Sequence, residues 1–249
     1  MKSSGLKVLS YNIQEGGRGR LRAVAELIRA QQADVVALLE ANSRAGAWVL
    51  ARHLKMELAF GKANSDFHVA WLSRHPIVGT TNHRLPILSK TMLEIQVVWQ
   101  GELLRLFATH LAGGADKIHP SQEAPALLDA LRTYAGEPHM LVGDLNSLAP
   151  CDPIGPSPLS EEIMRNGVDA DPRRAIELVL GAGYVDCFRT LHPAAREPGY
   201  TFPAAAPWLR LDYIFASPEM AARLDASGLV VSSKAARASD HFPVWARFR

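Results

Sequence analysis

Side chains that can bind a cation, contact a phosphate or move a proton stand where predicted strands of this chain meet loops. They are Asn12, Glu40, His110, Asp144, Asn146, Asp212, Asp240 and His241. These residues are spread over nearly the whole length, so they form one site only in a fold that gathers strand ends at a single edge. This requirement constrains the fold more than any other feature of the sequence.

The composition is that of an ordinary globular protein. The chain has 249 residues, of which 48% are hydrophobic and 21% charged, and this is enough to bury a large core. Lys and Arg total 27 against 25 for Asp and Glu, so the net charge of +2 neither demands nor excludes a nucleic acid partner. No linker or repeat marks a boundary, and we expect a single domain over residues 1–249.

Several features bear on where the protein works. The first residues are polar and lead into a predicted strand, so we expect no secretory segment. No apolar run approaches the roughly 18 residues needed to cross a membrane. Cys151 and Cys187 are the only cysteines and do not suggest a zinc site or a disulfide framework. We therefore expect a cytoplasmic protein in a reducing setting, monomeric by default.

Hydrophobic patterns predict strands at intervals along the chain. Short alternating or wholly apolar runs indicate strands, and Gln100-Gly101 indicates the turn of a hairpin. The predicted strands cover residues 6–13, 35–39, 69–72, 93–98, 103–108, 140–142, 211–216 and 244–248, the last two closing the chain. The run at 35–39 is apolar throughout, so we expect both of its faces to be buried.

Helices are predicted where apolar residues recur at helical spacing. The first contains Leu21, Val24, Leu27 and Ile28, the second starts near Ser121 as its N-cap, and the third covers residues 172–180. Residues 150–172 are rich in Pro, Asp, Ser and Gly, so we interpret them as a long surface excursion with a short helix over 161–165.

Asp144 and Asn146 form the most informative pair. They lie two residues apart after an apolar strand, and in an extended segment their side chains project to the same side. A carboxylate can accept a proton from water while a neighbouring amide donates to a phosphate oxygen. The alternative is an Asx turn at the end of a buried strand.

Glu40 and Asn12 admit two interpretations each. Glu40 follows a wholly apolar run, where an ionised carboxylate is costly to bury unless it is paired or binds a cation. It could instead face solvent at the end of its strand. Asn12 could contribute a ligand or simply cap a turn.

The remaining candidates are short signals. His241 beside Asp240 can act as a base or donate to phosphate, and Asp212 can orient it as carboxylates commonly orient catalytic imidazoles. Asp212 could equally be a surface or salt-bridge residue, and His110 a satisfied core histidine. Of the other histidines, His68 heads a predicted strand and is the one to follow. Hydrolysis of a phosphoester needs a cation, an activated water and oxyanion donors, and these residues can supply all three.

Six motifs in this order carry a resemblance to a known family. They are Ser10-Tyr11-Asn12, Leu38-Leu39-Glu40, Thr109-His110-Leu111, Gly143-Asp144-Leu145-Asn146, Arg210-Leu211-Asp212-Tyr213 and Ser239-Asp240-His241. Together they resemble the endonuclease/exonuclease/phosphatase superfamily, which has the fold of pancreatic-type DNase, and the match spans the chain. The resemblance implies an α+β fold, a four-layer α/β/β/α sandwich of two mixed sheets flanked by helices.

The resemblance also implies roles for the candidate residues. Glu40 would hold Mg2+ or Mn2+, helped by Asn12 and Asp240. Asp144 would position or deprotonate the attacking water, and Asn146 and His110 would contact phosphoryl oxygens. Asp212 would orient His241, which would serve as base or as oxyanion stabiliser.

Two departures from the family pattern narrow the subfamily. Most relatives have Gln before the metal-binding Glu, whereas Leu39 precedes Glu40, so a supporting hydrogen bond is missing or supplied elsewhere. Apurinic endonucleases typically have Lys where this chain has Asn42 and Tyr where it has His110. The stretch Trp208-Leu209-Arg210-Leu211-Asp212-Tyr213 is nevertheless similar to the apurinic enzymes.

We therefore expect a metal-dependent phosphoesterase that acts on a phosphodiester, with nucleic acid as the first candidate substrate. Arg18, Arg20 and Arg74 would then be phosphate contacts near the site. A lipid or small phosphoester is the alternative, and residues 203–208 are the one candidate for a lipid-facing apolar loop. A third alternative is a binding module that kept the fold and lost the chemistry.

Overall fold

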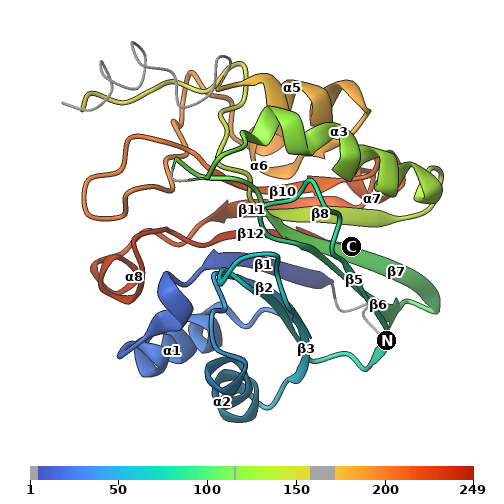
Figure 1. Ribbon diagram of the computed structural model, residues 1–249, viewed down its shortest axis with the longest axis vertical. Helices are drawn as coiled ribbons and strands as arrows, with labels where there is room; N and C mark the ends of the chain where they lie inside the picture. Colours follow the sequence, from blue (N-terminus) through green and yellow to red (C-terminus); the bar gives the residue numbers. More distant parts are fainter. Residues whose placement is uncertain (1–4, 115, 158–171) are drawn as a thin grey trace.

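Two six-stranded β-sheets pack face to face in the computed structural model, which describes residues 5–114, 116–157 and 172–249 (Figure 1). Sheet A contains, in order across the sheet, β11 (Leu224–Leu229), β12 (Val244–Phe248), β1 (Leu6–Asn12), β2 (Val35–Leu39), β4 (Val69–Ser73) and β3 (Glu57–Gly61). Sheet B contains β5 (Ile77–His83), β6 (Met92–Trp99), β7 (Glu102–His110), β8 (His139–Asp144), β10 (Asp212–Ala216) and β9 (Val185–Asp186). Both sheets are mixed, as predicted.

Helices cover the outer faces of the two sheets and complete four layers (Figure 1). Sheet A is covered by α1 (Leu21–Gln31), α2 (Arg44–Leu54) and α8 (Ser233–Ala238), and sheet B by α3 (Pro120–Leu131) and α5 (Arg174–Gly181). The short elements are η1 (Glu15–Gly17), η2 (Arg132–Tyr134), α6 (Cys187–Leu191) and α7 (Pro218–Ala221). Within the described ranges, no helix combines the length and apolar character needed to cross a membrane.

The core has one apolar layer between the sheets and one beneath each set of helices. Strand β2 shows how the sequence builds two of them. Val35, Ala37 and Leu39 point into the layer between the sheets, and Val36 and Leu38 point toward the helices on sheet A. The side chains of a strand alternate between its faces, so a strand covered on both sides must be apolar throughout.

Each sheet contains a parallel pair, and both pairs end at the same edge of the molecule. In sheet A, β1 runs parallel to β2 with Asn12 opposite Leu39, and α1 connects them. In sheet B, β7 runs parallel to β8 with His110 opposite Asp144, and α3 connects them. Antiparallel neighbours begin where these strands end, so β10 starts at Asp212, directly opposite Asp144. The convergence of strand ends that the sequence requires is therefore present.

Several sequence predictions need correction. The second predicted helix is α3, which begins at Pro120. Its N-cap is His119, whose backbone N–H donates to Gln122 Oε1 (2.9 Å), so Ser121 is not the cap. The third predicted helix, expected over 172–180, is α5. It begins at Arg174, and Arg173 is its N-cap. Strand β11, which was not predicted, lies between the two predicted last strands in sequence. The helix expected over 161–165 lies outside the described residues.

A glycine next to Asp144 allows the two parallel strands of sheet B, β7 and β8, to approach closely. Gly143 has a φ of +148°, and a Cβ at this position would lie 1.8 Å from the Thr109 carbonyl oxygen of the neighbouring strand. A side chain here therefore meets both backbone strain and a collision with a central strand.

We expect Gly143→Ala to lower the free energy of unfolding by roughly 3 kcal/mol in urea denaturation, because β8 cannot move away without breaking the parallel pairing. Gly101→Ala is the matched control. Gly101 also has a positive φ, +83°, but an added Cβ would meet nothing within 4 Å. Its loss should be about 1 kcal/mol. Equal losses in the two variants would contradict the importance of the close approach.

Candidate active site

All eight predicted residues gather at the edge where the two parallel pairs end. Strands β1 and β2 end at Asn12 and just before Glu40, while β7 and β8 end at His110 and Asp144. The loop between α8 and β12 supplies Asp240 and His241. Six of the eight side chains line a cleft of about 270 Å³, and the other two, Asn12 and Asp212, bond to residues that line it. The cleft residues are Glu40, Phe67, Lys90, His110, Gly113, Gly114, Asp116, Asp144, Asn146, Phe202, Asp240 and His241.

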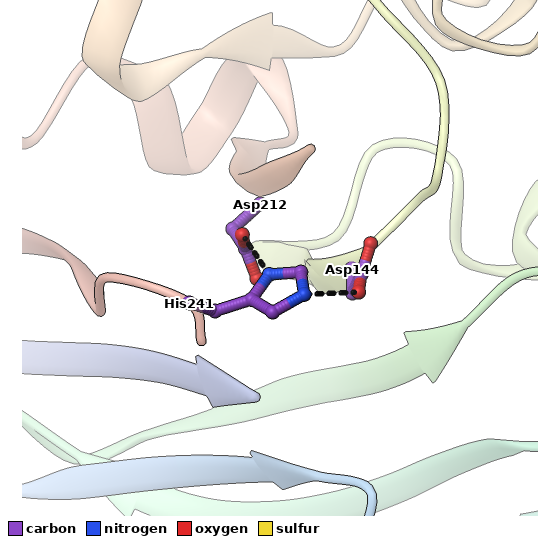
Figure 2. A group of neighbouring side chains, drawn as sticks. All are labelled: Asp144, Asp212 and His241. Atoms are coloured by element: carbon purple, nitrogen blue, oxygen red, sulfur yellow. Dashed lines mark hydrogen bonds and ion pairs between the residues drawn. The ribbon is translucent and has the colours of Figure 1, made fainter. Parts of the chain in front are cut away.

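His241 lies between two carboxylates (Figure 2). Its Nδ1 is 2.8 Å from Asp212 Oδ2, and its Nε2 is 3.7 Å from Asp144 Oδ2. Burial alone would lower the pKa of His241, but Asp212 and Asp144 raise it to about 10. The ring is therefore held in one orientation with Nε2 toward the cleft, and its protonated form is stabilised.

Asn12 connects the two sheets at this edge. Its Nδ2 donates both to Glu40 Oε1 (3.1 Å) and to Asp144 Oδ2 (3.0 Å), so one amide links carboxylates from opposite sheets. Its Oδ1 accepts the backbone N–H of Gln14 (3.0 Å), which is the turn-capping bond of the alternative interpretation. The turn-capping bond is therefore present and does not exclude the role of ligand, which stays a prediction.

The Glu40 carboxylate is held by two hydrogen bonds although Leu39 precedes it, where the resemblance to the family led us to expect Gln. Leu39 points into the core between the sheets, while the Glu40 carboxylate accepts from Asn12 and from the backbone N–H of Glu15 (2.8 Å). These two donors supply the missing supporting hydrogen bond. Glu40 also has a left-handed backbone (φ 54°), and such strain in a residue other than glycine is often found at functional sites.

Asp144 and Asn146 form an Asx turn and still share the cleft. The Asn146 backbone N–H donates to Asp144 Oδ1 (3.0 Å), and Asn146 has a φ of 45°, so the segment is not extended as predicted. The Asn146 amide donates to His110 Nε2 (3.1 Å) and to the Leu111 carbonyl oxygen (3.1 Å). Burial raises the pKa of Asp144 and lowers that of His110 to about 4, so His110 is neutral near pH 7.

The oxygen-rich donor set suits a hard divalent cation. Carboxylates of Glu40, Asp144 and Asp240 line the same cleft, and burial followed by the charge of nearby Glu40 raises the pKa of Asp240. Like charges held together in a partly buried cleft are stabilised by a cation. Mg2+ and Mn2+ prefer such oxygen ligands. The residues present therefore fit a divalent ion.

A second group could also hold an ion. One ligand atom each from Asp144, Asp212 and His241 lie within 4.8 Å of one another, and Asp212 Oδ1 is buried with no hydrogen-bond partner in the described part of the chain. The hydrogen bond between His241 Nδ1 and Asp212 already explains why these residues are close. We therefore favour Glu40 as the centre of the metal site.

A buried ion-pair network fixes the backbone just before Asp212, at the start of β10. Arg210, only 1% exposed, bonds to Asp152 (2.6 Å) and Asp186 (2.6 Å). Thr201 Oγ1 accepts the backbone N–H groups of Leu211 (3.0 Å) and Asp212 (3.3 Å). The start of β10 is therefore fixed by two independent sets of bonds, and this network was not predicted.

Other residues that the sequence singled out are not among those that line the cleft. Arg74 was expected near the site, which is wrong: it donates to the Ala33 carbonyl oxygen (3.0 Å), before the start of β2 and so at the far end from Glu40. Arg20 donates to the carbonyl oxygens of Ala238 and Gln14, and His68 accepts the N–H of Ala63. In the apolar loop at 203–208, Trp208 is buried rather than exposed.

Four side chains that line the cleft were not predicted from the sequence, namely those of Phe67, Lys90, Asp116 and Phe202. Phe202 packs against the His241 ring with centroids 4.7 Å apart, and Phe67 faces His110 at 6.3 Å. Lys90 and Asp116 form an ion pair in the same wall. Lys90 stands just before a strongly apolar strand, as Glu40 stands just after one, and that was the signal available in the sequence.

The whole chain is similar to known proteins of one family. The model of the Endonuclease/Exonuclease/phosphatase family matches residues 9–241. A search of curated proteins finds no match. An AP endonuclease from Archaeoglobus fulgidus is 22% identical with a TM-score of 0.80, and the 3′ phosphatase NExo from Neisseria, solved with a product DNA hairpin, is 22% identical with a TM-score of 0.77. Each alignment covers 98% of this chain and 99% of the other.

A humanised TDP2 from D. rerio is 19% identical with a TM-score of 0.69, over 99% of this chain and 100% of that one. At these identities the structural likeness establishes the fold, and the family match adds the membership. With the DNase I-like sandwich in place and the match running from β1 to His241, this chain belongs to the endonuclease/exonuclease/phosphatase family.

Proposed function

We propose that the protein is a divalent-metal-dependent phosphodiesterase that cleaves a P–O bond by in-line attack of water. The observation that supports this proposal is the position of Asp144 beside the Asp212–His241 pair: Asp144 and His241 both line the cleft, and His241 Nε2 lies 3.7 Å from Asp144 Oδ2. A base for water and a donor for phosphate thus stand side by side. Catalysis of this kind requires both within hydrogen-bond reach of the reacting atoms.

Each protein group has a defined task in this proposal. Asp144, with its pKa raised by burial, accepts the proton of the attacking water. His241, backed by Asp212, donates from Nε2 to a phosphoryl oxygen, because two flanking carboxylates favour the protonated ring. Asn146 donates to a second phosphoryl oxygen by exchanging one of its present acceptors, His110 Nε2 or the Leu111 carbonyl. His110 holds that amide in place and faces the same oxygen.

Glu40, Asp240 and Asn12 would hold the Mg2+ or Mn2+ ion. When bound, the ion would neutralise phosphate charge and stabilise the departing oxygen. Asn12 also limits how far Glu40 and Asp144 can separate, because its amide bonds to both. Gln14 Nε2 donates to Asp240 Oδ2 (3.0 Å), which fixes the carboxylate on the opposite side.

Nucleic acid is the substrate class that we favour. NExo, similar in fold over the whole chain, was solved with a DNA hairpin. A lipid substrate has less support, because Trp208 is buried and the exposed tip of that loop carries only small side chains and proline. An inactive binding module would not need eight such polar side chains gathered at one cleft. A monomer in the cytoplasm stays a prediction.

We expect Asp144→Ala and His241→Ala each to reduce hydrolysis of bis(4-nitrophenyl) phosphate by at least about 10²-fold, because each removes one half of the proton-transfer machinery. The controls are Asp129→Ala and His53→Ala, which remove the same groups from exposed positions. Circular dichroism should show the same fold in all four variants. Full turnover by either cleft variant would refute the assignment.

We also expect EDTA to stop the reaction and excess Mg2+ or Mn2+ to restore it, because three carboxylates in the cleft would otherwise repel an anionic substrate. The measurement is initial rate against free metal concentration in a chelator buffer. Activity indifferent to chelator would point to a mechanism without a metal.

A further inference from the structure

The cleft contains one buried ammonium group whose charge is cancelled within the cleft itself. Lys90 is 3% exposed, and its Nζ pairs with Asp116 Oδ2 at 2.5 Å. Among the described residues that line the cleft, Lys90 is the only Lys or Arg, whereas four carboxylates line it. The balance of charge available to an anionic ligand therefore depends strongly on this pair.

Lys90 is placed next to the groups proposed to contact phosphate. The Leu111 carbonyl oxygen accepts from Lys90 Nζ (3.1 Å) and from Asn146 Nδ2 (3.1 Å), so the ammonium and the amide converge on one atom. Phe67 covers the ammonium from the solvent side, with 5.8 Å between Nζ and the ring centroid. The ammonium therefore lies in the wall of the cleft and not on the open surface.

The surrounding backbone is rigidly held. Glu123 of α3 is fully buried, and its two carboxylate oxygens accept the backbone N–H groups of Ser89 (2.6 Å) and Ala112 (2.5 Å). These segments carry Lys90 on one side and Leu111 on the other. Asp116 is held from its own side, because its Oδ2 also accepts the Gly113 N–H (2.7 Å). Several independent hydrogen bonds therefore fix the positions of Lys90 and Asp116.

We propose that the Lys90–Asp116 pair sets the charge selectivity of the cleft, so that it accepts singly charged phosphodiesters and rejects doubly charged phosphate monoesters. This inference rests on the proposed function. A phosphodiester carries one negative charge, whereas a monoester carries nearly two once the pH exceeds about 6. With Asp116 present, the Lys90–Asp116 pair adds no net charge to the cleft, so it offers nothing to offset the second charge of a monoester.

Two single variants should move the selectivity in opposite directions. Asp116→Asn keeps the size of the side chain and an acceptor for the Gly113 N–H, but it leaves the charge of Lys90 uncancelled. The doubly charged monoester should therefore bind and react better relative to the diester. Lys90→Gln leaves the negative charge of Asp116 uncancelled, so binding and hydrolysis of the monoester should fall further relative to the diester. One unit of charge acting over ~10 Å at an effective dielectric constant of ~20 corresponds to roughly tenfold in rate or binding.

The test compares kcat/KM for 4-nitrophenyl phosphate and bis(4-nitrophenyl) phosphate with Mn2+ at roughly pH 8, where the monoester is fully charged. We expect the monoester-to-diester ratio to rise about tenfold in Asp116→Asn and to fall about tenfold in Lys90→Gln. Asp129→Asn, which removes the same charge from an exposed position on α3, should leave the ratio unchanged. Thermal denaturation checks that each variant is folded, and if one fails to fold the other decides.

The outcomes separate this inference from the function on which it rests. A wild-type protein that hydrolyses neither compound contradicts the proposed function. Diester hydrolysis by the wild type with ratios that stay within about twofold in both variants, or that shift in the same direction, overturns the selectivity role alone.

Discussion

Negative charge confined at one edge of two sheets is the constraint on which the candidate site depends. The carboxylates of Glu40, Asp144 and Asp240 share a cleft, and burial raises the pKa of Asp144 and of Asp240, so their ionised forms need compensating partners. The chain supplies amide and imidazole donors from other elements, chiefly Asn12 and His241. The proposed divalent ion would complete this compensation, so binding of metal and stability of the charged site are linked.

The topology explains why such distant residues meet. A parallel strand pair needs a crossover, and here each crossover is a helix that returns the chain to the start of the next strand. Both pairs therefore deliver strand ends to one edge, while the antiparallel strand β10 begins at that edge with Asp212. The same arrangement occurs in both sheets, and Asn12 bonds across them. Moving either sheet would separate Glu40 from Asp144.

The sequence was informative where periodicity and chemistry agree. The apolar run of β2 and the strand that ends at Asp144 were predicted, because a strand covered on both faces must be apolar. The α2 helix was missed although Ser43 caps it by accepting the Gly46 N–H, and β11 was missed because its side chains are only partly buried and follow no clear alternation. Arg74 was misplaced because its position depends on which end of β4 faces the site. Lys90 and Asp116 meet through tertiary packing, which no local pattern records.

The choice between interpretations also depended on the fold. For Asn12 and Asp144, the turn-forming and the functional interpretations were treated as competitors. In each residue, however, one oxygen caps the turn while the other polar atom makes a separate hydrogen bond at the edge of the cleft, so the turn does not exclude the proposed role. The most direct test of the account is an anomalous difference map from crystals soaked in Mn2+. It should show a peak about 2.0–2.3 Å from a Glu40 carboxylate oxygen. No peak at Glu40, or a single peak between Asp212 and His241, would contradict the account.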